Sequence, residues 1–209
     1  MSERRIPNLL LHVVFQQVRD LMGEKSLAML LRQSGLSDYT NNPPPADESP
    51  AITVHEYSTL LANIYEVFGP RGSRAIFTQG GRQGGQEIRR LHPARYAVAG
   101  AALKLLPENK RIELILQKVE EEGMELYGNP HRLQEEDDAF VMEIHDCPYC
   151  AEIARRARAG GPSVSHPVCH IATAVYQEMI AWGTGHSHPV RETACIALGD
   201  PACVFRIEK

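Results

Sequence analysis

The chain has no long apolar run and no block of consecutive basic residues. Its apolar segments fall far short of the roughly 18 residues that span a bilayer, which argues against a membrane span. The net charge of −4 argues against nucleic acid as a direct partner. Near the N-terminus, His12, Gln16 and Gln17 interrupt the apolar residues, so this segment is not a signal peptide. With five cysteines, an odd number, we expect a cytoplasmic protein with reduced thiols.

The sequence also has little of what catalysis requires. It contains no Ser/His/Asp arrangement, no pair of catalytic carboxylates and no dinucleotide-binding fingerprint. Four glycines between Gly80 and Gly85 could cradle an anion through backbone N–H groups. They lack the Lys-Ser/Thr of a phosphate-binding loop and follow no clear strand, so we interpret them as a flexible or close-packed loop. A binding protein is therefore expected rather than an enzyme.

Apolar spacing and helix-breaking residues predict helices first and strands afterwards. Helices are expected at residues 7–22, 24–33, 53–68, 92–106, 107–127 and 165–182, the third opened by a capping box between Thr53 and Glu56. Strands are expected at residues 131–136 and 138–145, followed by a hairpin of residues 189–198 and 202–207. The fold class is therefore α+β, with N-terminal helices followed by an antiparallel sheet that a long helix crosses.

The first helix is apolar on more than one side. Its apolar residues are Leu9, Leu10, Leu11, Val13, Val14, Phe15, Val18 and Leu21. Such a helix must be buried, either in the core of its own subunit or against a second subunit. We expect residues 1–52 to be a helical extension that forms a homodimer, and residues 53–209 to be a small-molecule-binding domain.

The most specific chemical feature is a set of three cysteines and one glutamate near the C-terminus: Cys169, Glu192, Cys195 and Cys203. Three thiolates and a carboxylate satisfy a tetrahedral zinc ion. The alternative is that the cysteines are reduced and pack as small apolar residues. Glu192 and Cys195 are an odd number of residues apart, so a regular strand would point them to opposite faces. The strand must begin after Glu192, or it must contain a bulge.

These residues, with the sequences around them, resemble the 4-vinyl reductase domain family. The resemblance rests on Pro167–His170, on Glu192–Cys195 and on Gly199–Phe205, and it is best over residues 90–209. It implies a small-molecule-binding domain similar in fold to subunits of the transport-protein-particle complex, as in hydrocarbon-sensing regulators and a bacteriochlorophyll-biosynthesis protein. Aromatic-sensing members hold zinc close to the ligand pocket with this pattern, so the resemblance implies the same role for Cys169, Glu192, Cys195 and Cys203, which would tie the C-terminal hairpin.

Cys147 and Cys150 form a separate C-x-x-C pair at a junction between a strand and a helix. This spacing occurs in redox dithiols and in metal sites, and two unconnected thiols in a loop are the simplest alternative. The resemblance does not require this pair, so its role stays open between a second metal site and a redox pair.

We interpret the chain as a non-enzymatic protein that binds or senses a hydrophobic or aromatic ligand and carries a structural zinc ion. The expected pocket lies between the long helix and the sheet, with Phe140, Tyr176 and Trp182 as candidate lining residues. One alternative is an accessory or carrier protein in tetrapyrrole synthesis, since no hydride-donor motif supports a reductase. A weaker alternative is a thiol redox protein that uses Cys147 and Cys150. Any signal would pass to a separate partner protein that the sequence does not identify.

Overall fold

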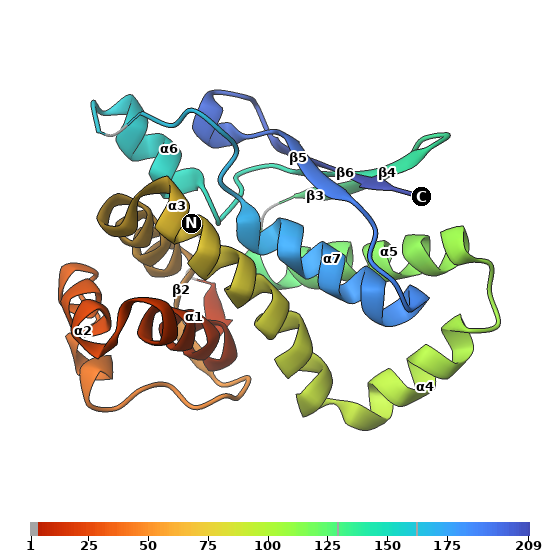
Figure 1. Cartoon of the computed structure of the whole chain (residues 1–209), viewed down its shortest axis with the longest axis horizontal. Helices are drawn as coiled ribbons and strands as arrows, with labels where there is room; N and C mark the ends of the chain where they lie inside the picture. The colour runs from red at the N-terminus through yellow and green to blue at the C-terminus, as the bar shows by residue number, and fades with distance from the viewer. Residues whose placement is uncertain (1–3, 129, 162) are drawn as a thin grey trace.

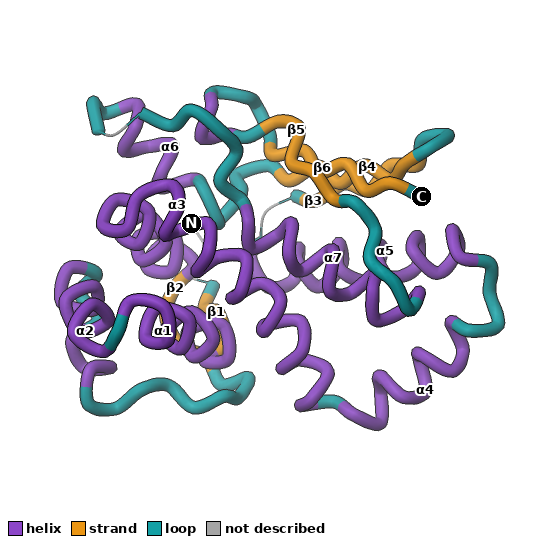
Figure 2. Tube along the Cα trace, viewed as in Figure 1, coloured by secondary structure: helices purple, strands orange, loops and turns teal. Residues whose placement is uncertain are grey.

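The computed structural model describes residues 4–128, 130–161 and 163–209. Within these residues the chain forms seven α-helices and two antiparallel sheets (Figures 1 and 2). The helices are α1 (Asn8–Met22), α2 (Glu24–Gln33), α3 (Val54–Leu91), α4 (Pro93–Leu103), α5 (Glu108–Tyr127), α6 (Ala151–Arg158) and α7 (His170–Thr184). The strands are β1 (Arg5–Pro7), β2 (Pro50–Thr53), β3 (His131–Glu135), β4 (Ala139–Ile144), β5 (Val190–Ala194) and β6 (Cys203–Glu208). The expected α+β class is confirmed.

The larger sheet has the strand order β3-β4-β6-β5, and α5 and α7 lie along one of its faces (Figure 1). Alternate residues of β4 and β6 point into this layer, as the alternation in the sequence predicts. Phe140, Met142, Phe205 and Ile207 are all fully buried there. Every helix among the described residues is too short or too polar to cross a bilayer.

The main departure from the predicted elements is in α3. Thr53 and Glu56 form the expected capping box, but the helix does not end before Gly69 and Pro70. Gly69 has a φ of 66°, which kinks the chain, and Pro70 then occupies the start of a helical stretch that runs to Leu91. Proline is tolerated there because the first residues of a helix have no N–H to bond.

The Gly80–Gly85 segment is therefore helical, and its prediction as a loop was wrong. The reason is a close contact with α7, which packs across this part of α3. A Cβ atom on Gly81 would lie 2.4 Å from the carbonyl oxygen of Ile171 and 2.8 Å from the Cβ of Ala174. Glycine is needed for this approach of two backbones, and the approach repays the low helix propensity of the glycines.

The N-terminal helix is buried within its own subunit. Leu11, Val14, Phe15 and Val18 pack with residues of α2 and α3 in one hydrophobic cluster, and each is at most 3% exposed. Of the eight apolar residues that suggested a dimer, Leu21 is the most exposed, at 46%. The alternative that the helix joins the core of its own chain thus accounts for its apolar faces. The homodimer and the domain boundary at residue 53 stay predictions.

A buried ion cluster attaches α6 to α3. Glu152 accepts hydrogen bonds from Arg155 and from Arg156, whose Nε lies 2.9 Å away. Arg156 also donates to Asn63 and Glu66 of α3, in both cases at 2.8 Å. The pKa of Glu152 falls from 4.5 to about 2, chiefly because Arg155 donates to the carboxylate. This cluster fixes the helix that directly follows Cys150.

We expect Gly81→Ala to lower the free energy of unfolding by about 1–3 kcal/mol, because the added methyl group overpacks the contact with Ile171. Gly84→Ala is the matched control in the same helix, since a Cβ atom there meets nothing within 4 Å. Better helix propensity should make that control up to about 1 kcal/mol more stable. Urea denaturation measures both variants, and similar effects of the two changes would contradict the close contact.

We expect Glu152→Gln to lower the free energy of unfolding at neutral pH by about 1–3 kcal/mol, because two buried arginine contacts lose their charge partner. The lowered pKa means that the unfolded chain binds the proton more readily. Glu152 therefore stabilises the fold above pH 4.5, and this contribution is lost as the pH falls towards about 2.

Denaturation curves between neutral pH and about pH 2 test this dependence, and the variant should show a shallower loss of stability in acid. Glu121→Gln is the control, because its exposed ion pair with Lys118 should contribute about 0–1 kcal/mol. An unchanged acid slope in Glu152→Gln would remove the proposed role of this cluster.

Candidate functional site

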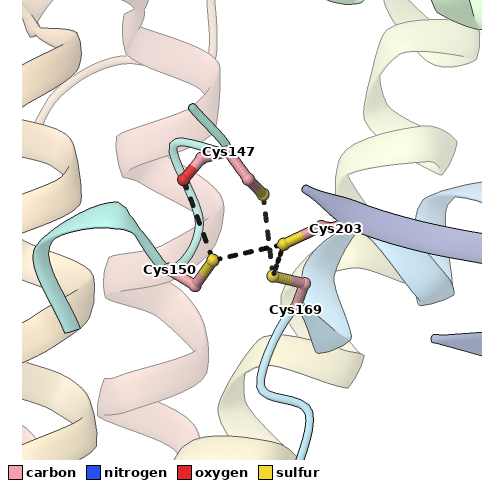
Figure 3. A group of neighbouring side chains, drawn as sticks. All are labelled: Cys147, Cys150, Cys169 and Cys203. Atoms are coloured by element: carbon pink, nitrogen blue, oxygen red, sulfur yellow. Dashed lines mark hydrogen bonds between the residues drawn. The ribbon is translucent and has the colours of Figure 1, made fainter. Parts of the chain in front are cut away.

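All five cysteines meet in one buried cluster. Cys147 and Cys150 come from the loop before α6, Cys169 immediately precedes α7, Cys195 follows β5, and Cys203 begins β6. Each is at most 1% exposed, and none forms a disulfide. Figure 3 shows four of them pointing toward one another from separate segments of the chain. The cluster thus joins the sheet, α7 and the loop before α6.

The structure brings together the four residues that the sequence singled out. One ligand atom from each of Cys169, Glu192, Cys195 and Cys203 lies within 4.8 Å of the others. The pairing of β5 with β6 shifts register between Glu192 and Ala194, so the expected bulge is confirmed, with Thr193 as the extra residue. The bulge resolves the odd spacing between Glu192 and Cys195.

Backbone groups hold these side chains in place. The N–H of Cys169 donates to Glu192 Oε2 at 2.8 Å, while the other oxygen, Oε1, is buried and has no hydrogen-bond partner. The N–H of Ile196 donates to Cys203 Sγ at 3.5 Å. The carboxylate of Asp200 accepts from the N–H of Cys195 at 2.8 Å, which fixes the turn. A buried carboxylate oxygen without a donor, next to thiols, is the arrangement that a cation would satisfy.

Cys147 and Cys150 join Cys169 and Cys203 in a second group whose sulfur atoms lie within 4.8 Å of one another. The Sγ–Sγ distances are 3.6 Å from Cys147 to Cys169, 3.4 Å from Cys150 to Cys203 and 3.6 Å from Cys169 to Cys203. Zinc–sulfur bonds of about 2.3 Å place tetrahedral ligands about 3.8 Å apart, so these separations suit one metal ion. Sequence reasoning placed this pair apart from the other three cysteines, and no local signal joins them.

The electrostatics of the cluster centre on Cys203. Its pKa lies well below the usual value because the thiols of Cys147 and its neighbours donate to the sulfur. Burial raises the pKa of Cys147 and Cys169, and it raises that of Glu192 from 4.5 to about 10. Without a metal, the cluster therefore concentrates negative charge on one sulfur and keeps most other donors protonated. A bound metal would displace those protons.

The donor set therefore fits zinc. A structural zinc ion takes four sulfur, nitrogen or oxygen ligands in a tetrahedron, and both groups supply four. Such a site has no open position for a substrate. Zinc at Cys169, Glu192, Cys195 and Cys203 stays a prediction, as does the zinc-tied hairpin.

A separate apolar cavity of about 130 Å³ lies among α1, α3, α5 and α7. Its wall on α3 consists of backbone at Gly80, Gly81, Gly84 and Gly85. The facing walls consist of apolar side chains, among them Val13, Val14, Val119, Leu126, Val175 and Met179. The glycine spacing of one and four residues puts all four on one face of the helix, which leaves space where side chains would stand. That spacing was a signal for the cavity in the sequence.

Few polar groups reach this cavity. Tyr57, Tyr127 and Tyr149 contribute to its lining, and burial holds the pKa of each hydroxyl well above its usual value. Tyr149 donates to the hydroxyl of Tyr127 at 3.1 Å. Glu122 also lines the cavity, and it pairs with Arg95 at 2.7 Å. The cavity is therefore suited to uncharged molecules.

The three candidate pocket residues lie elsewhere. Phe140 and Tyr176 are buried in the core between α7 and the sheet, where Tyr176 meets Phe205 edge to face at 5.3 Å. Trp182 packs on Tyr96 at 5.1 Å beside a second opening, of about 410 Å³, between α4, α5 and α7. The glycine-walled cavity thus lies against α3, on the helical side of α7, whereas the pocket was expected beside the hairpin.

Comparison with known proteins supports a sensor-like fold. Solved structures with a similar fold include an unliganded Fe(II) H-NOX protein from K. algicida, with a TM-score of 0.62, 13% or less sequence identity and coverage of 98% of this chain and 96% of that chain. An H-NOX protein from S. oneidensis in the Fe(II)NO state has a TM-score of 0.59 and 11% identity, and covers 97% of this chain and 98% of its own. The phenol-responsive sensory domain of the transcription activator PoxR, with phenol, has a TM-score of 0.52 and 17% identity over 77% of each chain.

Sequence comparison identifies the C-terminal part of the chain. The bacteriochlorophyll synthase 23 kDa chain of Cereibacter sphaeroides is 40% identical over 60 residues, which are 29% of this chain and 29% of that protein. The match thus spans less than a third of that relative. The model of the V4R domain family matches residues 140–209. The family resemblance expected from the sequence is thereby confirmed for residues 140–209, which carry a V4R domain within a chain of H-NOX-like fold.

Proposed function

We propose that this chain binds a small, uncharged, largely apolar molecule in the glycine-walled cavity. The observation that carries this proposal is the run of four glycines on one face of α3, which keeps a space open inside an otherwise packed helical layer. A dry cavity of about 150 Å³ lined by apolar side chains is large enough for benzene. The space here, about 130 Å³, suits a ligand of that size. The V4R family and the sensor-like fold agree with small-molecule sensing.

The cysteine cluster would support this function without taking part in it. A zinc ion held by Cys169, Glu192, Cys195 and Cys203 would fix the start of α7 to the hairpin. Two turns of α7 then present Ile171, Val175 and Met179 to the cavity. A four-ligand metal would thus hold one wall of the ligand site in place. Output would pass to a separate partner protein.

A tetrapyrrole carrier is the second candidate. Drug-sized ligands occupy pockets of about 300–1,000 Å³, which the glycine-walled cavity does not reach. The opening beside Trp182, of about 410 Å³, shares Tyr96, Val119 and Met179 with that cavity. A larger flat ligand would have to use this opening, and the named bacteriochlorophyll relative is the reason to consider one.

The redox reading has less support. A reactive dithiol needs an accessible thiol with a lowered pKa. Cys147 and Cys150 are at most 1% exposed, and the pKa of each thiol is raised, by burial for Cys147 and by its hydrogen bond with Cys147 for Cys150. We therefore do not propose a thiol redox activity.

Toluene is a suitable probe for the cavity. We expect saturable binding that raises the melting temperature and changes the fluorescence of Trp182, the sole tryptophan, which packs on the cavity residue Tyr96. Gly84→Leu should weaken binding at least about tenfold, because its side chain enters the empty space that the ligand would use. Ala97→Leu, on the exposed side of α4, is the control and should bind as the unchanged protein does. Binding that survives Gly84→Leu would place the ligand elsewhere.

Metal analysis of the native protein should give at least one zinc ion per chain. Cys195→Ser should lose a zinc ion and the stability that it confers, about 4 kcal/mol when free zinc is a thousand times the dissociation constant. Thr193→Ala is the control, because its exposed side chain lies between two ligands and donates to a carbonyl rather than to the cluster. A protein that remains free of metal after refolding with zinc, with an unchanged melting temperature, would rule out the site.

A further inference from the structure

The cluster offers more donors than one metal ion can use. Five thiols and the Glu192 carboxylate make six donors, whereas a tetrahedral ion takes four. One ion at the site implied by the family would leave Cys147 and Cys150 buried beside it as thiols. One ion on the four-sulfur group would leave Cys195 and Glu192. In the second case Glu192 Oε1 would keep its buried position without a partner.

The two groups of four donors share one edge. Cys169 Sγ and Cys203 Sγ belong to both groups and lie 3.6 Å apart. Cys147 lies 3.6 Å from the first of these sulfurs and Cys150 lies 3.4 Å from the second. Figure 3 shows this pair on the loop before α6, facing the shared cysteines. The six donors do not form a single group within 4.8 Å, so they separate into two overlapping sites.

We propose that the cluster binds two zinc ions that share Cys169 and Cys203 as bridging thiolates. Cys147 and Cys150 complete the first ion, and Glu192 and Cys195 complete the second. The inference rests on the metal site of the proposed function and extends it to the cysteine pair that the family pattern leaves unused. Each ion has four ligands, and all six donors are used.

The charge of the cluster supports a second ion. Zinc bound to three thiolates and one carboxylate carries a formal net charge of −2, with Cys147 and Cys150 still protonated. A second Zn²⁺ that displaces the protons of Cys147 and Cys150 leaves that net charge unchanged, because two released protons balance its charge. His170, beside Cys169, stays neutral at pH 7, since burial lowers its pKa to about 4. Metal ions are thus the natural cations for these donors.

The loop that carries the cysteine pair is already fixed in place. The buried hydroxyl of Ser58 on α3 donates to the carbonyl of Pro148 at 2.7 Å. The N–H of Ala151 donates to the carbonyl of Cys147 at 2.9 Å. Tyr149 packs edge to face on Tyr127 of α5 at 5.5 Å. These contacts hold both thiols toward the cluster before any metal binds, which lowers the ordering cost of binding.

Native mass spectrometry of the full chain, refolded with zinc, counts the ions directly. We expect two per chain in the unchanged protein, one in Cys147→Ser/Cys150→Ser, one in Glu192→Gln/Cys195→Ser and none in Cys203→Ser. Tyr149→Phe is the control within the same loop, because it keeps the ring contact and both thiols, and it should hold two ions.

Cadmium substitution of the unchanged protein gives a readout that does not depend on whether variants fold. Two bridged ions should give two ¹¹³Cd resonances with scalar coupling through the shared sulfurs. A single resonance, with one zinc ion kept by Cys147→Ser/Cys150→Ser, would overturn the second ion and leave the first site standing. A protein that takes up no zinc or cadmium would overturn both.

Discussion

The close approach of α3 and α7 is the constraint on which both candidate sites depend. At Gly81 the backbone of α3 lies directly against the carbonyl of Ile171, in the first turn of α7. Two residues before that carbonyl, Cys169 supplies a thiol to the metal cluster, and the side chain of Ile171 lines the cavity. The depth at which α7 sits on α3 therefore sets the position of a metal ligand and of a cavity wall at the same time. Packed interfaces of this kind are rigid, because neighbouring side chains fill the space around them.

Local features of the fold could be predicted from the sequence because local chemistry determines them. The capping box of Thr53 and Glu56 marks the start of α3, and the alternation of Phe140, Met142 and Ile144 marks a strand with one buried face. The bulge at Thr193 followed from the spacing of Glu192 and Cys195 together with the requirement that both serve one site. In each case, residues a few positions apart carry the whole signal.

Features that depend on contacts between distant segments were not predictable in this way. The glycine run from Gly80 resembles a loop when only its neighbours are considered, and it is helical because α7 covers it. Cys147 and Cys150 gave no sign that they meet Cys203, more than fifty residues later, since β4 and β6 must first pair to bring them together. The pocket was expected beside the sheet because aromatic residues lie there. Phe140 and Tyr176 instead fill that space, and the cavity forms where side chains are missing.

The bulge at Thr193 makes β5 sensitive to its length rather than to its composition. Glu192 and Cys195 reach the same site because one extra residue in β5 shifts the alternation of its side chains against β6. The side chain of Thr193 is exposed, so many residue types can occupy that position. The loss or gain of one residue would restore or reverse the alternation and turn the carboxylate away from the thiols. In this strand the number of residues between two ligands is thus part of the metal site, whereas the identity of those residues is not.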